Sequence, residues 1–176
     1  LSYLSSETRQ VFKEKGIMYR RLLQPGIGLS WQQVFQTESK EEMEYNCRER
    51  GISYTWLGKN KVIIQWTKDA IISHPETLEE IWFNHGCFFN EHTLSDEVRS
   101  AFDSPDELPF NTFFGDGSPI PKSMLLEIEA AFSKARLKFL WQKGDVLVLD
   151  NMLMAHGRES FEGERSIRVL MAEATE

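Results

Sequence analysis

Residues 141–158 read WQKGDVLVLDNMLMAHGR. Within this stretch, residues 146–149 form a continuous apolar run, with Gly-Asp before it and Asp-Asn after it. Four apolar residues between turn-forming pairs predict a short strand that is buried on both of its faces. Residues 166–172 have a composition that predicts a second long strand. The C-terminal third is therefore expected to be dominated by strands.

Upstream of this stretch, helix and strand signals are mixed. They predict a helix from Ser5-Ser6 to Gly16, a strand at 17–19, a helix opened by a capping box at 39–42 and closed at Gly51, strands within 54–66, a loop over 103–121, and a helix from 122 to about 138. No repeat or low-complexity tract divides the chain. We expect one domain over 1–176, mainly β with helical insertions (α+β), resembling a decorated barrel or sandwich.

Composition narrows the possible functions. The chain has 176 residues and a formal charge of −7, which argues against a nucleic-acid partner because binding phosphates needs a basic face. No apolar run approaches the roughly 18 residues that cross a bilayer, so no membrane partner is expected. Cys47 and Cys87 lack metal-ligand spacing, and we expect free buried thiols in a reducing, cytoplasmic protein. The absence of an initiator Met predicts that this sequence is part of a longer protein.

His156 is the candidate metal ligand. It follows the predicted buried strand and precedes a polar loop with arginines close in the sequence. A histidine at the rim of a β structure, near arginines, suits a metal site that faces an anionic ligand. A single histidine is more often an ordinary core or surface residue, so that alternative stays open.

Arg165 and Arg168 are the candidate anion-binding residues. Alternation along a strand places them on opposite faces. An arginine that faces a closed apolar sheet needs a carboxylate or another acidic partner. The alternative is that both are solvated charges at an edge.

His74-Pro75-Glu76 offers a different metal site. Together with His156 it has the composition of the two-His-one-carboxylate triad of mononuclear iron enzymes. A His-x-Glu triplet arises often by chance, and Pro75 favours a turn. We therefore expect residues 74–77 to form a turn ahead of Trp82.

Taken together, several segments resemble the TauD/TfdA family of Fe(II)- and 2-oxoglutarate-dependent dioxygenases, and within it the SyrP-like branch. The resemblance covers about residues 16 to 172. It is carried by W141-x-x-GD, A155-HGR, F161-x-G-x-R, W31-QQVF-x-T, C47-R-x-x-G, H74-P-x-T, W82-FN and F114-GDG. It implies a double-stranded β-helix, or jelly-roll barrel, of which this chain is the C-terminal portion, lacking the N-terminal part.

The resemblance also implies a site. His156 matches the family's distal iron ligand, and Arg168 or Arg165 matches the arginine that binds the 2-oxoglutarate carboxylate, with alternation slightly favouring Arg168. The family's His-x-Asp/Glu pair lies upstream of the segment that matches 1–16, so it is not found here. The implied cofactors are Fe(II) and 2-oxoglutarate.

The implied activity is hydroxylation of an amino acid or other small substrate, which is in some cases tethered to a carrier protein, with release of succinate and CO2. Halogenation and an oligomeric state both stay open. The alternative function is a non-catalytic jelly-roll protein that binds a ligand without iron.

Overall fold

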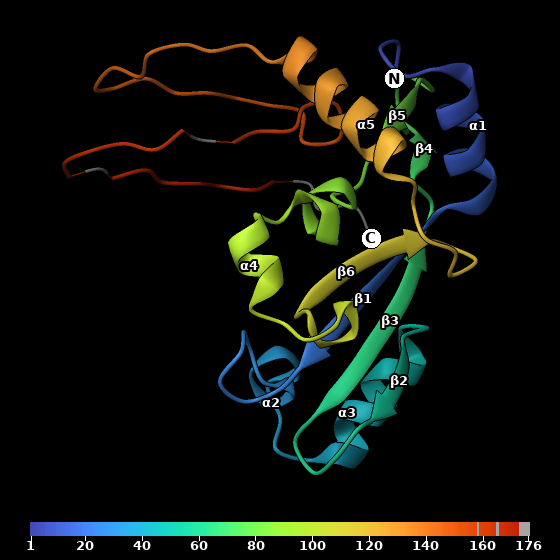
Figure 1. Cartoon of the computed structure of the whole chain (residues 1–176). Coiled ribbons are helices and arrows are strands. Elements are labelled where there is room, and N and C mark those ends of the chain that lie inside the picture. Colours follow the sequence, from blue (N-terminus) through green and yellow to red (C-terminus); the bar gives the residue numbers. More distant parts are fainter. Residues whose placement is uncertain (158, 165, 173–176) are drawn as a thin grey trace.

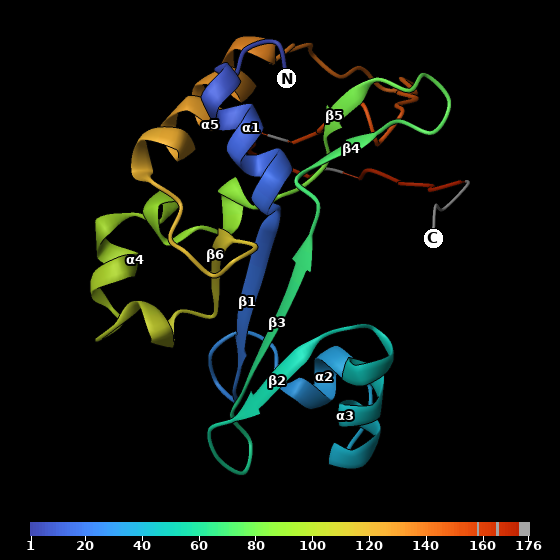
Figure 2. The same ribbon diagram turned by 90° about the vertical axis from the view of Figure 1, so that its right-hand side faces the viewer.

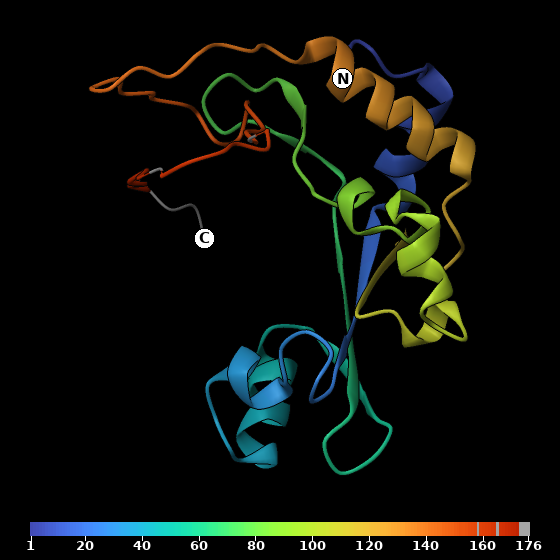
Figure 3. The ribbon, with the colours of Figure 1, turned by 60° about the vertical axis from the view of Figure 1, so that its left-hand side comes forward.

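The computed structural model describes residues 1–157, 159–164 and 166–172. Residues 1–135 form the body, and the chain beyond them runs out in two extended segments, 136–149 and the described residues of 155–172 (Figure 1). The two segments are joined by a turn at 150–154, where the chain comes back to the body (Figure 3). Among the described residues, all helices and strands lie in the body.

The first helix, α1 (Ser6–Lys15), begins and ends where the sequence predicts. The Ser5 hydroxyl accepts a hydrogen bond from the Thr8 amide, and Gly16 ends the helix at φ 66° and ψ −161°. Only glycine adopts this conformation readily. A Cβ atom at Gly16 would also lie 2.8 Å from the carbonyl oxygen of Lys68, so a side chain does not fit at this position. The chain passes directly from α1 into β1 (Ile17–Leu23).

One antiparallel sheet forms the centre of the body. Its strand order is β2-β3-β1-β6, with Tyr19 of β1 opposite Trp66 on one side and Thr112 on the other. The remaining strands of this sheet are β2 (Ser53–Trp56), β3 (Val62–Lys68) and β6 (Phe110–Phe114). The sheet is open, and the described residues contain no closed barrel. The antiparallel pairing is consistent with the expected jelly roll, but the complete barrel is not formed by these residues.

Strand β6 corrects the prediction of a loop over 103–121. The prolines in that range lie outside the strand itself, and its aromatic and β-branched residues pair with β1. A short 3-10 helix, η3 (Pro105–Glu107), precedes β6. The prolines lie at the ends of these short elements or between them, where they do not interrupt strand pairing.

Two hydrophobic clusters pack at opposite ends of the sheet (Figure 2). One lies under α1 and α5 (Lys122–Ala135) and centres on Phe12, whose ring lies 4.9 Å from that of Trp82 and 5.1 Å from that of Phe114. The other lies under α2 (Trp31–Phe35) and α3 (Lys40–Glu49) and includes Met43.

The shorter elements complete the body. Those between residue 83 and η3 are η1 (Cys87–Phe89), η2 (Glu91–Thr93) and α4 (Asp96–Ser100). At α3, Ser39 caps the helix by accepting from the Glu42 amide, while the Glu42 carboxylate accepts from the Thr37 hydroxyl, so only half of the predicted capping box is formed. Cys47 and Cys87 are free and buried, as predicted.

The strands predicted at 146–149 and 166–172 are not formed. Val146 is 86% exposed and Leu170 is 93% exposed, and neither segment pairs with a strand in the described part of the chain. A strand is stable only when its backbone amides and carbonyls have partners. The prediction of a buried strand at 146–149 and of a strand at 166–172 is therefore wrong for this chain.

No helix in the described ranges has the length and apolar character needed to cross a membrane.

Candidate functional site

The residues predicted to form the site lie on the C-terminal segments. His156 follows the turn at 150–154 and is exposed, and Arg168 is exposed on the second extended segment. Arg165 lies outside the described residues. Within the described ranges, His156 and Arg168 have no hydrogen bond or ion pair with each other. The structure does not bring them together.

His74 lies in a very different environment. It follows β4 (Ile71–Ser73), which pairs with β5 (Glu80–Trp82) in a two-stranded hairpin, and residues 75–77 form the predicted turn. The residue is only 4% exposed. Its backbone amide donates to the carbonyl of Glu79 at 2.8 Å, and its carbonyl accepts from the amide of Leu78 at 2.9 Å. The hairpin therefore fixes the His74 backbone on both sides.

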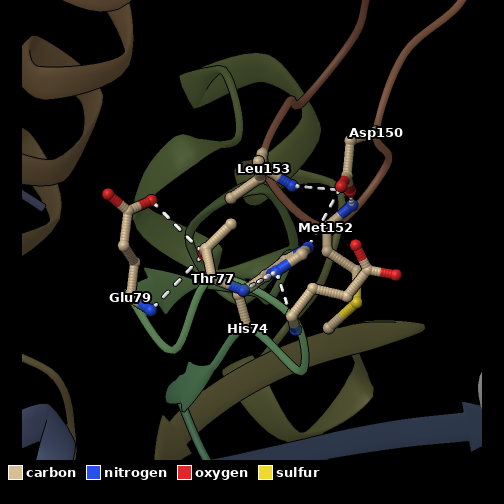
Figure 4. Close-up of polar contacts among 7 residues, drawn as sticks. His74, Thr77, Glu79, Asp150, Met152 and Leu153 are labelled. Atoms are coloured by element: carbon tan, nitrogen blue, oxygen red, sulfur yellow. Dashed lines mark hydrogen bonds and ion pairs between the residues drawn. The ribbon is translucent and has the colours of Figure 1, made fainter.

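Both ring nitrogens of His74 are engaged (Figure 4). Nδ1 accepts from the amides of Glu76 at 3.3 Å and Thr77 at 3.1 Å, while Nε2 lies 3.0 Å from Oδ2 of Asp150. Amides can only donate, so Nδ1 carries a lone pair and the ring proton is on Nε2. Nε2 therefore donates to the Asp150 carboxylate.

Asp150 also holds the turn that follows it. Oδ1 accepts from the amides of Met152 at 2.9 Å and Leu153 at 3.3 Å. These bonds, chiefly the one from Met152, hold the pKa of the Asp150 carboxyl below its ordinary value, and the His74 bond acts in the same direction. A single carboxylate thus joins the β4–β5 hairpin to the turn that leads to His156.

The described residues do not form a complete metal centre. No three side chains of His, Cys, Asp or Glu in residues 1–157, 159–164 and 166–172 lie together as a metal-binding group. His74 has no free ring nitrogen, and Glu76 is exposed at the turn. The arrangement in which His74, Glu76 and His156 bind iron together is therefore not present, and His156 is left as a single candidate ligand.

The contact between His74 and Asp150 was not predicted from the sequence. Each residue stands in a segment that carries the family resemblance, but the two are 76 residues apart. No periodicity or spacing rule pairs positions at that separation. The only local signal was a histidine followed by a proline, and it indicated a turn without indicating a partner.

The sequence as a whole matches one family of oxygenases. Residues 1–171 match the family described as "Taurine catabolism dioxygenase TauD, TfdA family", and the chain belongs to that family. It is 40% identical over 174 residues to "Dapdiamide synthesis protein DdaC" of Enterobacter agglomerans, covering 97% of this chain and 53% of that protein.

A more distant relative comes from a plant. The chain is 24% identical over 167 residues to a protein of Arabidopsis thaliana described as clavaminate synthase-like, covering 90% of this chain and 48% of that protein. The chain thus spans about half the length of each of these relatives.

Proposed function

We propose that this chain is part of an Fe(II)- and 2-oxoglutarate-dependent oxygenase. The observation that carries the proposal is the family match over residues 1–171. The reaction class is oxidation of a substrate coupled to decarboxylation of 2-oxoglutarate, which releases succinate and CO2. The described residues alone do not supply a complete iron site.

His156 is the proposed iron ligand in this chain. It is exposed, and neither ring nitrogen has a partner in the described ranges. A histidine that is to bind a metal must keep one nitrogen lone pair free, which His156 does and His74 does not. We propose that the other two protein ligands come from residues outside this sequence.

Arg168 or Arg165 is the proposed group that binds the 2-oxoglutarate carboxylate. A guanidinium suits this role because its planar fork can donate two parallel hydrogen bonds to one carboxylate. Arg168 lies on the exposed second segment, and within the described ranges its guanidinium has no hydrogen bond or ion pair. The preference for Arg168 rests only on the alternation expected from the sequence, because residues 166–172 form no strand in the structure.

The proposed substrate is an amino acid or another small molecule, in some cases tethered to a carrier protein. The name of the Enterobacter relative refers to the synthesis of dapdiamide, which supports a biosynthetic role. Hydroxylation is the proposed outcome.

A non-catalytic binding protein is the second candidate. One observation favours it: no group of three potential ligands is found in the described ranges. In that case the fold would bind a ligand or partner without iron.

Turnover distinguishes the two candidates. The full-length gene product is incubated with Fe(II), 2-oxoglutarate and candidate amino acids, and succinate is measured. We expect succinate formation that falls to background in His156→Ala and is unchanged in His92→Ala, a matched exposed histidine. Absence of succinate with every substrate, despite retained binding of 2-oxoglutarate, would favour the binding protein.

A further inference from the structure

The turn at 150–154 is the point where the chain returns to the body between its two extended segments (Figures 1 and 3). The segment before it, 136–149, and the segment after it, 155–172, contain no helix or strand in their described residues. His156 is two residues beyond this turn. The position of His156 therefore depends on what holds the turn.

Asp150 organises the turn with both its side chain and its backbone. Its Oδ1 accepts from the amides of Met152 and Leu153, and its carbonyl oxygen accepts from those of Leu153 and Met154. The backbone bonds are 3.2 Å and 2.9 Å long. Once Asp150 is fixed, the path of the chain to Met154 is fixed with it.

His74 offers a rigid donor for Asp150. Its backbone is held by the β4–β5 hairpin, and its ring is oriented by two amides at Nδ1. The side chains of His74 and Asp150 point toward one another from these two parts of the chain (Figure 4). A donor that is already oriented loses little conformational entropy when it binds its acceptor.

We propose that His74 is a positioning residue: through its hydrogen bond to Asp150 it fixes the 150–154 turn and so sets the position of His156. The importance of this position for metal binding rests on the proposed function. His74 itself does not contact the metal, because both of its ring nitrogens are engaged.

Two substitutions remove this bond while keeping the local turns. In His74→Asn, the shorter side chain keeps an acceptor for the amides of residues 76 and 77 but does not reach Asp150. In Asp150→Asn, the amide oxygen still accepts from Met152 and Leu153, but its NH2 group faces the Nε2 proton. In each variant, the hydrogen bond between the side chains at positions 74 and 150 is therefore lost.

Two matched controls leave the bond intact. His92→Asn replaces an exposed histidine elsewhere in the body. Asp145→Asn replaces another carboxylate that closes a turn, because Oδ2 of Asp145 accepts from the amide of Gln142 at 2.7 Å. Asp145 precedes the 150–154 turn.

The first measurement needs no metal. Amide hydrogen exchange is followed at Leu153 and Met154 in the full-length gene product. We expect exchange to be about tenfold faster in His74→Asn and in Asp150→Asn, no faster in the double variant than in the single ones, and unchanged in both controls. Unchanged exchange in both variants, with unchanged Tm, would overturn the proposal.

The second measurement uses Co(II) as the probe. We expect its affinity to fall about tenfold in both variants, as is typical for residues that orient a ligand, with Tm unchanged. A loss as large as that of His156→Ala would make His74 a ligand and overturn the positioning role. If His156→Ala itself leaves Co(II) affinity unchanged, the proposed iron site fails, and hydrogen exchange still decides whether His74 holds the turn.

Discussion

The His74 imidazole and the Asp150 carboxylate are 76 residues apart in the sequence, yet Nε2 and Oδ2 lie 3.0 Å apart. His74 is buried in the body, while Asp150 begins the turn that leads to His156. This bond therefore connects the ordered hairpin to the segment that carries the proposed iron ligand. It also explains why His74 itself is not available to a metal.

The pKa of the Asp150 carboxyl provides a test of this bond. It is held below the ordinary value of about 3.9, so the stability that the carboxylate gives the turn is fully present above about pH 4. This stability is lost as the pH falls through the lowered pKa. We expect an NMR titration to give a value below 3.9 that rises in His74→Asn without reaching 3.9, because the Met152 amide remains. A value above 3.9 in the unsubstituted protein would contradict the contact.

Gly16 is predicted to be essential for the link between α1 and β1. Gly16→Ala should lower the free energy of unfolding by more than about 3 kcal/mol, because it adds a backbone strain of about 1–3 kcal/mol to a steric overlap of similar cost. The overlap is with the Lys68 carbonyl oxygen. Urea denaturation measures the loss.

Gly51→Ala is the matched control for this prediction. Gly51 has a similar φ of 64° but no atom within 4 Å of an added Cβ. It should cost only about 1–2 kcal/mol, the usual penalty of a left-handed residue. Equal losses at the two positions would show that the approach of Lys68 to Gly16 is not as described.

The two cysteines should be unreactive in the folded protein. Burial raises the pKa of the Cys87 thiol to about 11, and it also raises the pKa of the Cys47 thiol. Little thiolate therefore exists at pH 8. We expect Ellman's reagent to label neither residue in the native protein and both in urea. Rapid labelling of Cys87 in the native state would contradict its burial.

The two arginines should differ in their effect on the cosubstrate. In the full-length gene product, Arg168→Met should weaken 2-oxoglutarate binding by about 10- to 100-fold, which corresponds to the loss of hydrogen bonds between charged groups. Arg165→Met should have a smaller effect. Isothermal titration calorimetry in the presence of Mn(II) measures the 2-oxoglutarate affinity of both variants. A larger loss of affinity in Arg165→Met than in Arg168→Met would show that Arg165 binds the carboxylate.

Features that depend on neighbouring residues were predicted well from the sequence. Ser5 and Gly16 mark the ends of α1, and the proline turn after His74 is present. These predictions succeed because caps and turns are decided by a few adjacent residues.

Features that depend on distant partners were predicted poorly. Strand β6 was missed because flanking prolines suggested a loop, although β1 supplies its partner. Residues 146–149 were predicted to be a buried strand, but no partner strand is present in the described part of the chain. The pairing of His74 with Asp150 is of the same kind, since it depends on how the hairpin and the turn meet in space.

The central claim is that His156 is one ligand of an iron site whose other ligands lie outside these 176 residues. It is tested most directly by anaerobic titration with Fe(II) and 2-oxoglutarate, following the visible charge-transfer band of the chelate. We expect the band in the full-length gene product, its loss in His156→Ala, and no band from the 176-residue chain alone. A band from the 176-residue chain alone, or none from the full-length gene product, would contradict the claim.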